Sequence, residues 1–155
     1  MNEDKIIEEY LNAQILCVGN LREVSQIIKN IFEKLISARD SDQTIYIMGN
    51  GGSASTATHF TSDLLKTSII KSKKRFKVHS LSDNIPVVLA WANDDEYNNI
   101  FLGQLENFLK KNDIVIGFSG SGNSENVIKA IEFANNNNAT TISFTGKGGG
   151  KISKI

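Results

Sequence analysis

The chain has 155 residues, 40% of them hydrophobic, and its 17 Lys and Arg balance 17 Asp and Glu. This length and apolar content suit one compact domain. The zero net charge argues against a dedicated nucleic-acid-binding protein, which draws most of its affinity from excess basic residues. No apolar run reaches the ~18–20 residues of a membrane-spanning helix, and no signal-peptide pattern is seen. Cys17 is the single cysteine, so a disulfide framework is excluded, and we expect a cytoplasmic protein.

Residues 1–41 are predicted to form a pair of helices. Apolar residues recur at helical spacing over 6–16 and again over 24–36, with Gly19-Asn20 between the two series. The second series includes Ile27, Ile31 and Leu35. It is apolar enough that other parts of the protein must cover this helix on more than one side. Packing against the domain's own core and contact with another subunit are both open interpretations.

Residues 42–155 are predicted to form the α/β core of a single domain that spans 1–155. Apolar runs at 44–48, 113–118 and 140–145 are typical of parallel strands buried under helices. The run 76–81 alternates apolar and polar residues, which predicts an edge strand. Helical patterns separate these runs, at 54–66, 85–92, 98–110 and 124–136. The expected fold is a three-layer αβα sandwich with a flavodoxin-like parallel sheet in the order 2-1-3-4.

This strand order predicts where a ligand binds. The first and third strands are neighbours whose connections run in opposite directions, so a crevice opens at their carboxyl ends. The loops Gly49–Ser55 and Ser119–Ser124 face that crevice, and both are rich in Gly and Ser.

The loop Ser119-Gly120-Ser121-Gly122-Asn123-Ser124 leaves a strand and enters a helix. Glycines expose backbone N–H groups, the helix amino end adds partial positive charge, and the serines add hydroxyl donors. Together they predict a cradle for a single phosphate, while the lysine motif of a nucleotide P-loop is absent. The alternative interpretation is that Ser124 only caps its helix and the rest is a turn. We favour phosphate binding, because all three features converge at the crevice.

His59 and Asp63 are four residues apart and share a face of the helix that follows the first strand. Such a pair can hold zinc or act as acid and base, but it can equally be a surface pair. Asn93-Asp94 closes the helix after the second strand. Its amide and carboxylate could bind sugar hydroxyls, or could form an ordinary turn.

Taken in order, these motifs resemble the sugar isomerase (SIS) domain, and within it the phosphoheptose isomerases, which act on sedoheptulose 7-phosphate. The resemblance covers nearly the whole chain. Its motifs are Gly49-Asn50-Gly51-Gly52-Ser53, His59-Phe60, Asn93-Asp94, Asn99-Ile100-Phe101, Ser119-Gly120-Ser121-Gly122-Asn123-Ser124, Val127-Ile128-Lys129-Ala130, Thr145-Gly146-Lys147 and Gly149-Gly150.

The resemblance implies a role for each site residue. The sugar would be bound by one set, Asn50, Gly51, Gly52, Ser53, Asn93 and Asp94, and its phosphate by another, Ser119, Gly120, Ser121 and Ser124. His59 would be a zinc ligand, and Asp63 stands where the family carries a catalytic, metal-binding Glu. Members of the family are homotetramers with sites between subunits, and their N-terminal helices take part in the assembly.

The sequence departs from the family pattern at three places. Gly120 replaces the usual Thr, and Asp63 is one methylene shorter than Glu. The chain ends at Ile155, where the resemblance implies a further strand and a helix bearing a Gln and a His. We therefore expect either a fragment or a protein that lacks half of the family's site residues. In both cases we expect the chain to bind sugar phosphate but to isomerise it poorly.

The leading hypothesis is a sugar-phosphate isomerase that converts a ketose phosphate to an aldose through an enediolate. Asp63 would be the base and His59 a ligand of one zinc ion, and the heptose product would feed lipopolysaccharide, capsule or other surface-glycan synthesis. Two alternatives stay open. One is a non-catalytic SIS module that binds a sugar phosphate or docks a protein, and the other is an isomerase of another phosphosugar.

Overall fold

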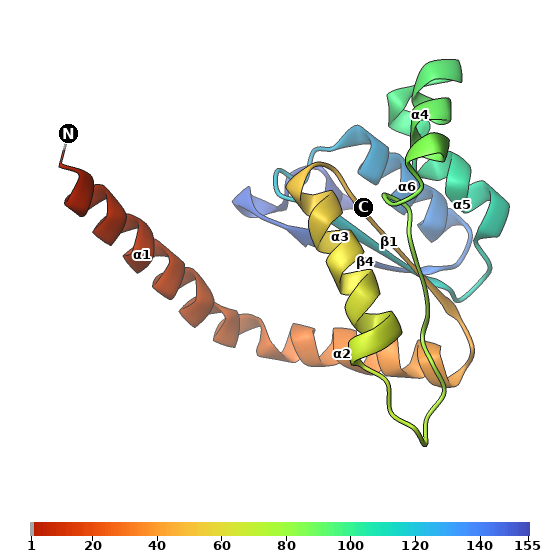
Figure 1. Ribbon diagram of the computed structural model, residues 1–155, viewed down its shortest axis with the longest axis horizontal. Helices are drawn as coiled ribbons and strands as arrows, with labels where there is room; N and C mark the ends of the chain where they lie inside the picture. The colour runs from red at the N-terminus through yellow and green to blue at the C-terminus, as the bar shows by residue number, and fades with distance from the viewer. Residues whose placement is uncertain (1) are drawn as a thin grey trace. The chain divides into compact units, whose positions relative to one another are not determined.

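The computed structural model describes residues 2–155. The chain forms two compact units, one ending at Leu35 and the other spanning Ile36–Ile155. The first unit contains α1 (Glu3–Asn20), the 3-10 turn η1 (Leu21–Val24) and the start of α2 (Ser25–Asp40), which are coloured red to orange in Figure 1. These are the two predicted helices. No helix among residues 2–155 is long and apolar enough to cross a membrane.

The second unit is built on a parallel sheet. Its strands are β1 (Thr44–Gly49), β2 (Lys77–Ser80), β3 (Ile114–Ser119) and β4 (Thr140–Thr145), in the order β2-β1-β3-β4. The predicted order and the predicted edge position of β2 are therefore confirmed. The register aligns Gly49 with Phe118, so the carboxyl ends of β1 and β3 finish side by side.

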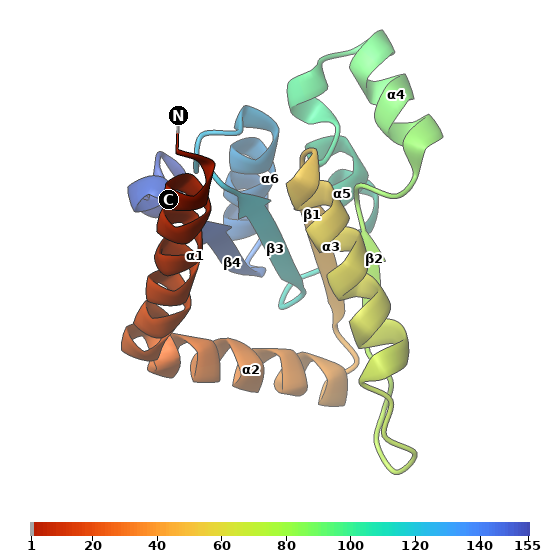
Figure 2. The same cartoon turned by 60° about the vertical axis from the view of Figure 1, so that its left-hand side comes forward.

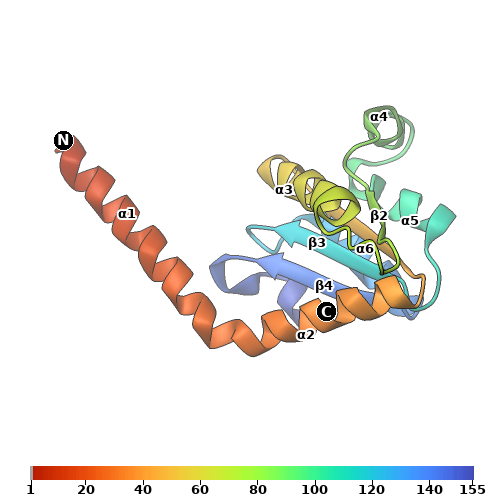
Figure 3. The ribbon, with the colours of Figure 1, turned by 60° about the horizontal axis from the view of Figure 1, so that its bottom comes forward.

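Helices cover both faces of this sheet, as Figures 2 and 3 show. On one face α3 (Gly52–Ser62) packs on β1, β2 and β3, and it continues into a π-helical turn, η2 (Asp63–Thr67). On the other face lie α5 (Leu102–Phe108) and α6 (Glu125–Asn136). Tyr46 and Met48 of β1 join the core on the α5 and α6 side. Because side chains alternate along a strand, the buried Ile45 and Ile47 point to the α3 side.

The strand β4 differs from its prediction. The run 140–145 was expected to be buried, but only Ile142 is, and Phe144 is 38% exposed. The physical reason is that β4 pairs with β3 alone, at the edge opposite β2, and α6 packs on it from one side. This edge strand carries Thr or Ser at four of its six positions, and most of it is left outside the core.

The connection between β2 and β3 carries a helix and a turn, and Val88 of the helix and Tyr97 of the turn line a pocket at the end of β1. The helix α4 (Ile85–Asp94) begins after Asn84, whose Oδ1 accepts a hydrogen bond from the Val87 N–H at 3.4 Å. Asn at this position and Pro86 in the first turn are the residues that helix starts favour. The short 3-10 turn η3 (Tyr97–Asn99) then leads into α5.

Candidate functional site

The first side of the site is the turn from β1 into α3. A Cβ on Gly49 would lie 2.7 Å from the backbone carbonyl carbon of Ser53, so only glycine allows the helix to start this close to the strand. The Ser53 N–H donates to the Asn50 carbonyl at 2.9 Å. The tight turn leaves the side chain of Asn50 at the carboxyl end of the sheet.

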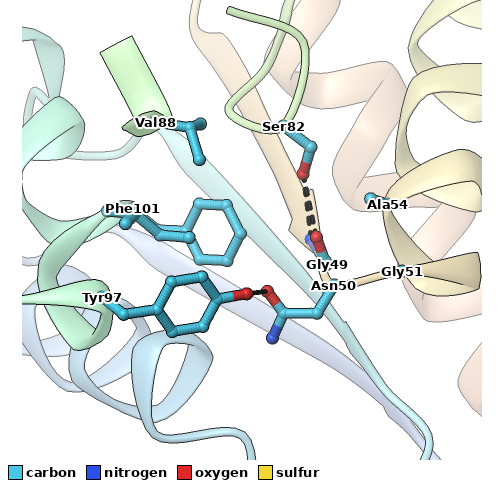
Figure 4. A pocket seen from close by; sticks show the side chains of 9 residues that line it. Gly49, Asn50, Gly51, Ala54, Ser82, Val88, Tyr97 and Phe101 are labelled. Atoms are coloured by element: carbon cyan, nitrogen blue, oxygen red, sulfur yellow. Dashed lines mark hydrogen bonds between the residues drawn. The ribbon is translucent and has the colours of Figure 1, made fainter. Parts of the chain in front are cut away.

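Asn50 lines a small pocket, shown in Figure 4. The pocket has a volume of about 160 Å³ and is lined by Gly49, Asn50, Gly51, Ala54, Ser82, Val88, Tyr97, Ile100 and Phe101. The Tyr97 hydroxyl lies 3.1 Å from Asn50 Oδ1, and the Ser82 hydroxyl donates to the Gly49 carbonyl at 3.0 Å. Asn50 also exchanges two hydrogen bonds with Asn126, at 2.8 and 2.9 Å.

The second side of the site is the serine loop, residues 119–124. Ser119 is buried at the end of β3, and its Oγ lies 3.0 Å from the Oγ of Ser124. Ser124 occupies the N-cap position of α6, but its side chain makes no capping hydrogen bond. Ser124 therefore stands at the cap position while its hydroxyl faces Ser119 instead of the helix. Ser121 is exposed, and its Oγ accepts a hydrogen bond from the Asn123 N–H at 3.1 Å.

A glycine-rich segment after β4 holds the serine loop in place. Gly122 has a φ of +65°, and a Cβ there would overlap the carbonyl oxygen of Gly149. Two backbone hydrogen bonds join the segments: Gly146 N–H to the Gly120 carbonyl at 3.1 Å, and Ile152 N–H to the Gly122 carbonyl at 3.0 Å. The sequence assigned no role to residues 146–152, although the run Gly148–Gly150 was a signal of close backbone approach.

His59 and Asp63 lie on α3 and at its end. Their Nε2 and Oδ2 atoms are 3.4 Å apart, and the side chains are 81% and 49% exposed. The Thr67 hydroxyl donates to Asp63 Oδ1 at 3.0 Å. The pair borders a hollow of about 450 Å³, whose other lining residues are Thr56, Phe60, Phe118 and Phe144.

The number of metal-ligating side chains near this pair decides whether the site can hold a catalytic zinc ion. A catalytic zinc site uses three protein ligands and keeps one open position. Within residues 2–155 no group of three His, Cys, Asp or Glu side chains lies close enough to hold a metal ion. One chain therefore supplies two of the three donors, and these residues do not by themselves fit a catalytic zinc.

Asn93 and Asp94 end α4 in a different place. Asn93 Nδ2 donates to Asp94 Oδ1 at 2.7 Å, and both residues are exposed. Asp94 lines a hollow of about 340 Å³ with Ala90, Trp91 and Asp95. The structure thus brings Ser119 and Ser124 together and sets Asn50 against the start of α6. It leaves the 59/63 pair in one hollow and Asp94 in another.

Two residues that touch the site were missed by the sequence analysis, Tyr97 and Asn126. Tyr97 lies 47 residues from its partner Asn50, and Asn126 lies 76 residues from it. The only available signal was proximity to quoted motifs, since Asn126 follows the serine loop and Tyr97 precedes Asn99-Ile100-Phe101.

Comparison with known proteins agrees with this architecture. The family described as SIS domain matches residues 9–146, so the chain contains a SIS domain. A probable phosphoheptose isomerase of Thermoplasma acidophilum is 37% identical over 155 residues, which cover all of this chain and 81% of that protein. The phosphoheptose isomerase of Helicobacter pylori strain P12 is 36% identical over 155 residues, all of this chain and 80% of that protein.

Solved structures give the same result. A phosphoheptose isomerase from Neisseria gonorrhoeae superposes with a TM-score of 0.80 at 27% identity, covering 96% of this chain and 80% of that one. One from Francisella tularensis shares the fold with a TM-score of 0.92 at 24% identity, covering 99% of this chain and 81% of that one. The chain belongs to the SIS-domain family, among the phosphoheptose isomerases.

Proposed function

We propose that this protein isomerises sedoheptulose 7-phosphate, a ketose, to the corresponding aldose, a heptose 7-phosphate. Relatives that share 36–37% of its sequence are named phosphoheptose isomerases, which supports a sugar phosphate as substrate. The observation that carries the proposal is the pair of serine hydroxyls 3.0 Å apart at the amino end of α6, of which Ser124 does not cap its helix.

In this proposal the serine loop binds the phosphate. Hydroxyls of Ser119, Ser121 and Ser124 donate to phosphate oxygens, and the N–H groups of the first turn of α6 add to the attraction. Gly120 lets the phosphate approach the backbone, since the space where its Cβ would lie is empty within 4 Å. Hydrogen bonds to a charged group of this kind contribute about 1.5–3 kcal/mol each.

The remaining residues act on the sugar. Asp63 is proposed as the base that takes a proton from the ketose C1 and returns it to C2, by way of an enediolate, while the proton of the O1 hydroxyl passes to O2. His59, with Nε2 3.4 Å from Asp63 Oδ2, orients that carboxylate. The loop residues Asn50, Gly51, Gly52 and Ser53 bind the sugar near its carbonyl, and Asn93 with Asp94 binds hydroxyls.

Zinc is proposed only as an ion bound weakly by His59 and Asp63. Because one chain supplies two donors, no chemical step is assigned to the metal. A titration with Zn²⁺ should give weak binding that is lost in His59→Ala. Equal binding by that variant would contradict this part of the proposal.

We further propose that the protein is a homo-oligomer, by analogy with its family a tetramer, and that it works in the cytoplasm. Large apolar side chains of α1, from Ile6 to Val18, are between 47% and 70% exposed in the single chain, and a second copy could cover them. The heptose phosphate product is proposed to serve surface-glycan synthesis, such as that of lipopolysaccharide or capsule.

The test of this function is conversion of sedoheptulose 7-phosphate followed by NMR. The unaltered protein should form the aldose slowly, and Asp63→Asn should lose at least about 100-fold in kcat while still binding the sugar phosphate. If Asp63→Asn leaves turnover unchanged, the assignment of Asp63 as the base is wrong. Binding of the sugar phosphate without any turnover by the unaltered protein would favour a non-catalytic sugar-phosphate sensor.

A further inference from the structure

The orientation of the Asn50 carboxamide is set by a backbone N–H of α6. The Val127 N–H donates to Asn126 Oδ1 at 2.9 Å and shares this proton with the Ser124 carbonyl at 3.1 Å. A backbone N–H can only donate, so the atom of Asn126 that faces it must be the carbonyl oxygen. This fixes which end of the Asn126 carboxamide is oxygen and which is nitrogen.

The assignment then passes from Asn126 to Asn50. Asn126 Nδ2 donates to Asn50 Oδ1 at 2.9 Å, and Asn50 Nδ2 donates to Asn126 Oδ1 at 2.8 Å. If Asn50 were turned over, two oxygens and two nitrogens would face one another. Asn126 is only 1% exposed, so water cannot replace these bonds.

Tyr97 completes the network from the other wall of the pocket, as Figure 4 shows. Its hydroxyl lies 3.1 Å from Asn50 Oδ1, and because that atom is an acceptor the hydroxyl must donate. The turn that carries Tyr97 is itself fixed to α6, since Lys129 Nζ donates to Asn99 Oδ1 at 3.0 Å and to Glu96 Oε2 at 3.3 Å.

A count of donors and acceptors gives the consequence. Both acceptor positions of Asn50 Oδ1 are taken, one by Tyr97 and one by Asn126, and one of its two N–H groups is given to Asn126. A single N–H therefore remains, on a half-buried side chain that lines the pocket. Toward a ligand, Asn50 can donate but cannot accept.

We propose that Asn126 and Tyr97 are positioning residues that hold Asn50 as a donor for an oxygen of the bound sugar. This inference rests on the proposed isomerase function. The oxygen that gains negative charge during isomerisation is that of the carbonyl as it becomes an enediolate. A donor already aimed at such an oxygen stabilises the transition state more than the ground state.

The test compares Tyr97→Phe with Tyr46→Phe. Each change removes one hydroxyl that donates across 3.1 Å, in the second case to the Phe108 carbonyl on the α5 side of the core. Side-chain amide signals of Asn50, assigned with Asn50→Ala, are followed by ¹H–¹⁵N NMR. They should shift and exchange faster with solvent in Tyr97→Phe and stay unchanged in Tyr46→Phe.

Enzyme kinetics then test whether Asn50 acts as a hydrogen-bond donor to the substrate. Loss of one neutral hydrogen bond should lower kcat/KM for sedoheptulose 7-phosphate by about 3- to 10-fold in Tyr97→Phe, mainly through kcat. Tyr46→Phe should keep the kcat/KM of the unaltered protein. In Asn126→Asp a carboxylate oxygen replaces Nδ2 and repels Asn50 Oδ1, so kcat/KM should fall further, and less so at low pH where the carboxylate is protonated.

Each outcome decides a separate point. Unchanged Asn50 signals in Tyr97→Phe would overturn the positioning role, whether or not the protein is active. Altered signals with unchanged kcat/KM would overturn the donor role. Absence of turnover in the unaltered protein would count against the proposed function, while the NMR comparison would still decide whether Tyr97 positions Asn50.

Discussion

Ser119 and Ser124 hold their hydroxyl oxygens 3.0 Å apart at the point where β3 ends and α6 begins. One residue is buried at the end of a strand and the other sits at the N-cap of a helix. Each hydroxyl has the other as its side-chain partner, so a phosphate that enters the loop exchanges one weak neutral contact for charge-assisted ones.

Ser124→Ala should therefore weaken binding of sugar phosphate without destabilising α6. We expect a loss of about 1–3 kcal/mol in calorimetric titration with the sugar phosphate. The melting temperature should stay close to that of Ser41→Ala, a change in an exposed turn. A lower melting temperature with unchanged affinity would instead assign Ser124 to the helix cap.

Gly122→Ala should destabilise the protein, because a Cβ there overlaps the Gly149 carbonyl and the φ of +65° is unfavourable for alanine. We expect a loss of about 2 kcal/mol or more in the free energy of unfolding, which lowers Tm by roughly 4–8 °C. Gly120→Ala is the matched control for stability, since its Cβ would meet nothing within 4 Å. Equal melting temperatures for the two variants would show that the two glycine segments do not pack as described.

Tyr46 should make stability fall at alkaline pH. Burial, and to a smaller degree the Asp113 carboxylate, raises the pKa of the Tyr46 hydroxyl above its usual value of 10.0. The unfolded chain therefore loses this proton at a lower pH than the folded one. The contribution is complete below pH 10 and is lost as pH rises through 10 toward the folded pKa. Denaturant unfolding between pH 9 and 11 should be less pH-dependent in Tyr46→Phe, and identical slopes would contradict this.

Leu16→Glu should disrupt assembly. Leu16 is 65% exposed in the single chain, and a buried glutamate would be costly in a contact between copies. Light scattering should give a multiple of 17.0 kDa for the unaltered protein and a smaller mass for this variant. Asn12→Glu adds the same charge on the same helix without removing an apolar side chain, and should keep the larger mass. A mass of 17.0 kDa for the unaltered protein would rule out the oligomer.

The sequence predicted the sheet order because the central strands are short continuous apolar runs, while the edge strand β2 alternates apolar and polar residues. β1 and β3 lie within one residue of their predicted bounds, and their order follows from the edge character of β2. Helix ends were less predictable. The helix predicted over 54–66 begins at Gly52, and its last turn from Asp63 is π-helical. Local spacing does not reveal such a change in winding.

The site was predictable only where its residues are close in sequence. The serine loop is a continuous segment, and the 59/63 pair follows from helical spacing. The partners of Asn50 come from two other segments of the chain, and no periodicity in the sequence indicates that they contact Asn50. A hydrogen bond between amides 76 residues apart depends on the packing of the whole domain.

The contact between the serine loop and residues 146–152 also bears on the entropy of binding. With backbone hydrogen bonds from Gly146 and Ile152, the loop is fixed before any ligand arrives. The conformational entropy of ordering it is therefore lost when the protein folds, and little of it remains to be lost on binding. Phosphate recognition by this loop should therefore carry little entropic cost from backbone ordering. The Gly146 and Ile152 amides, which donate to the loop, should be as protected from hydrogen exchange in the free protein as in the complex.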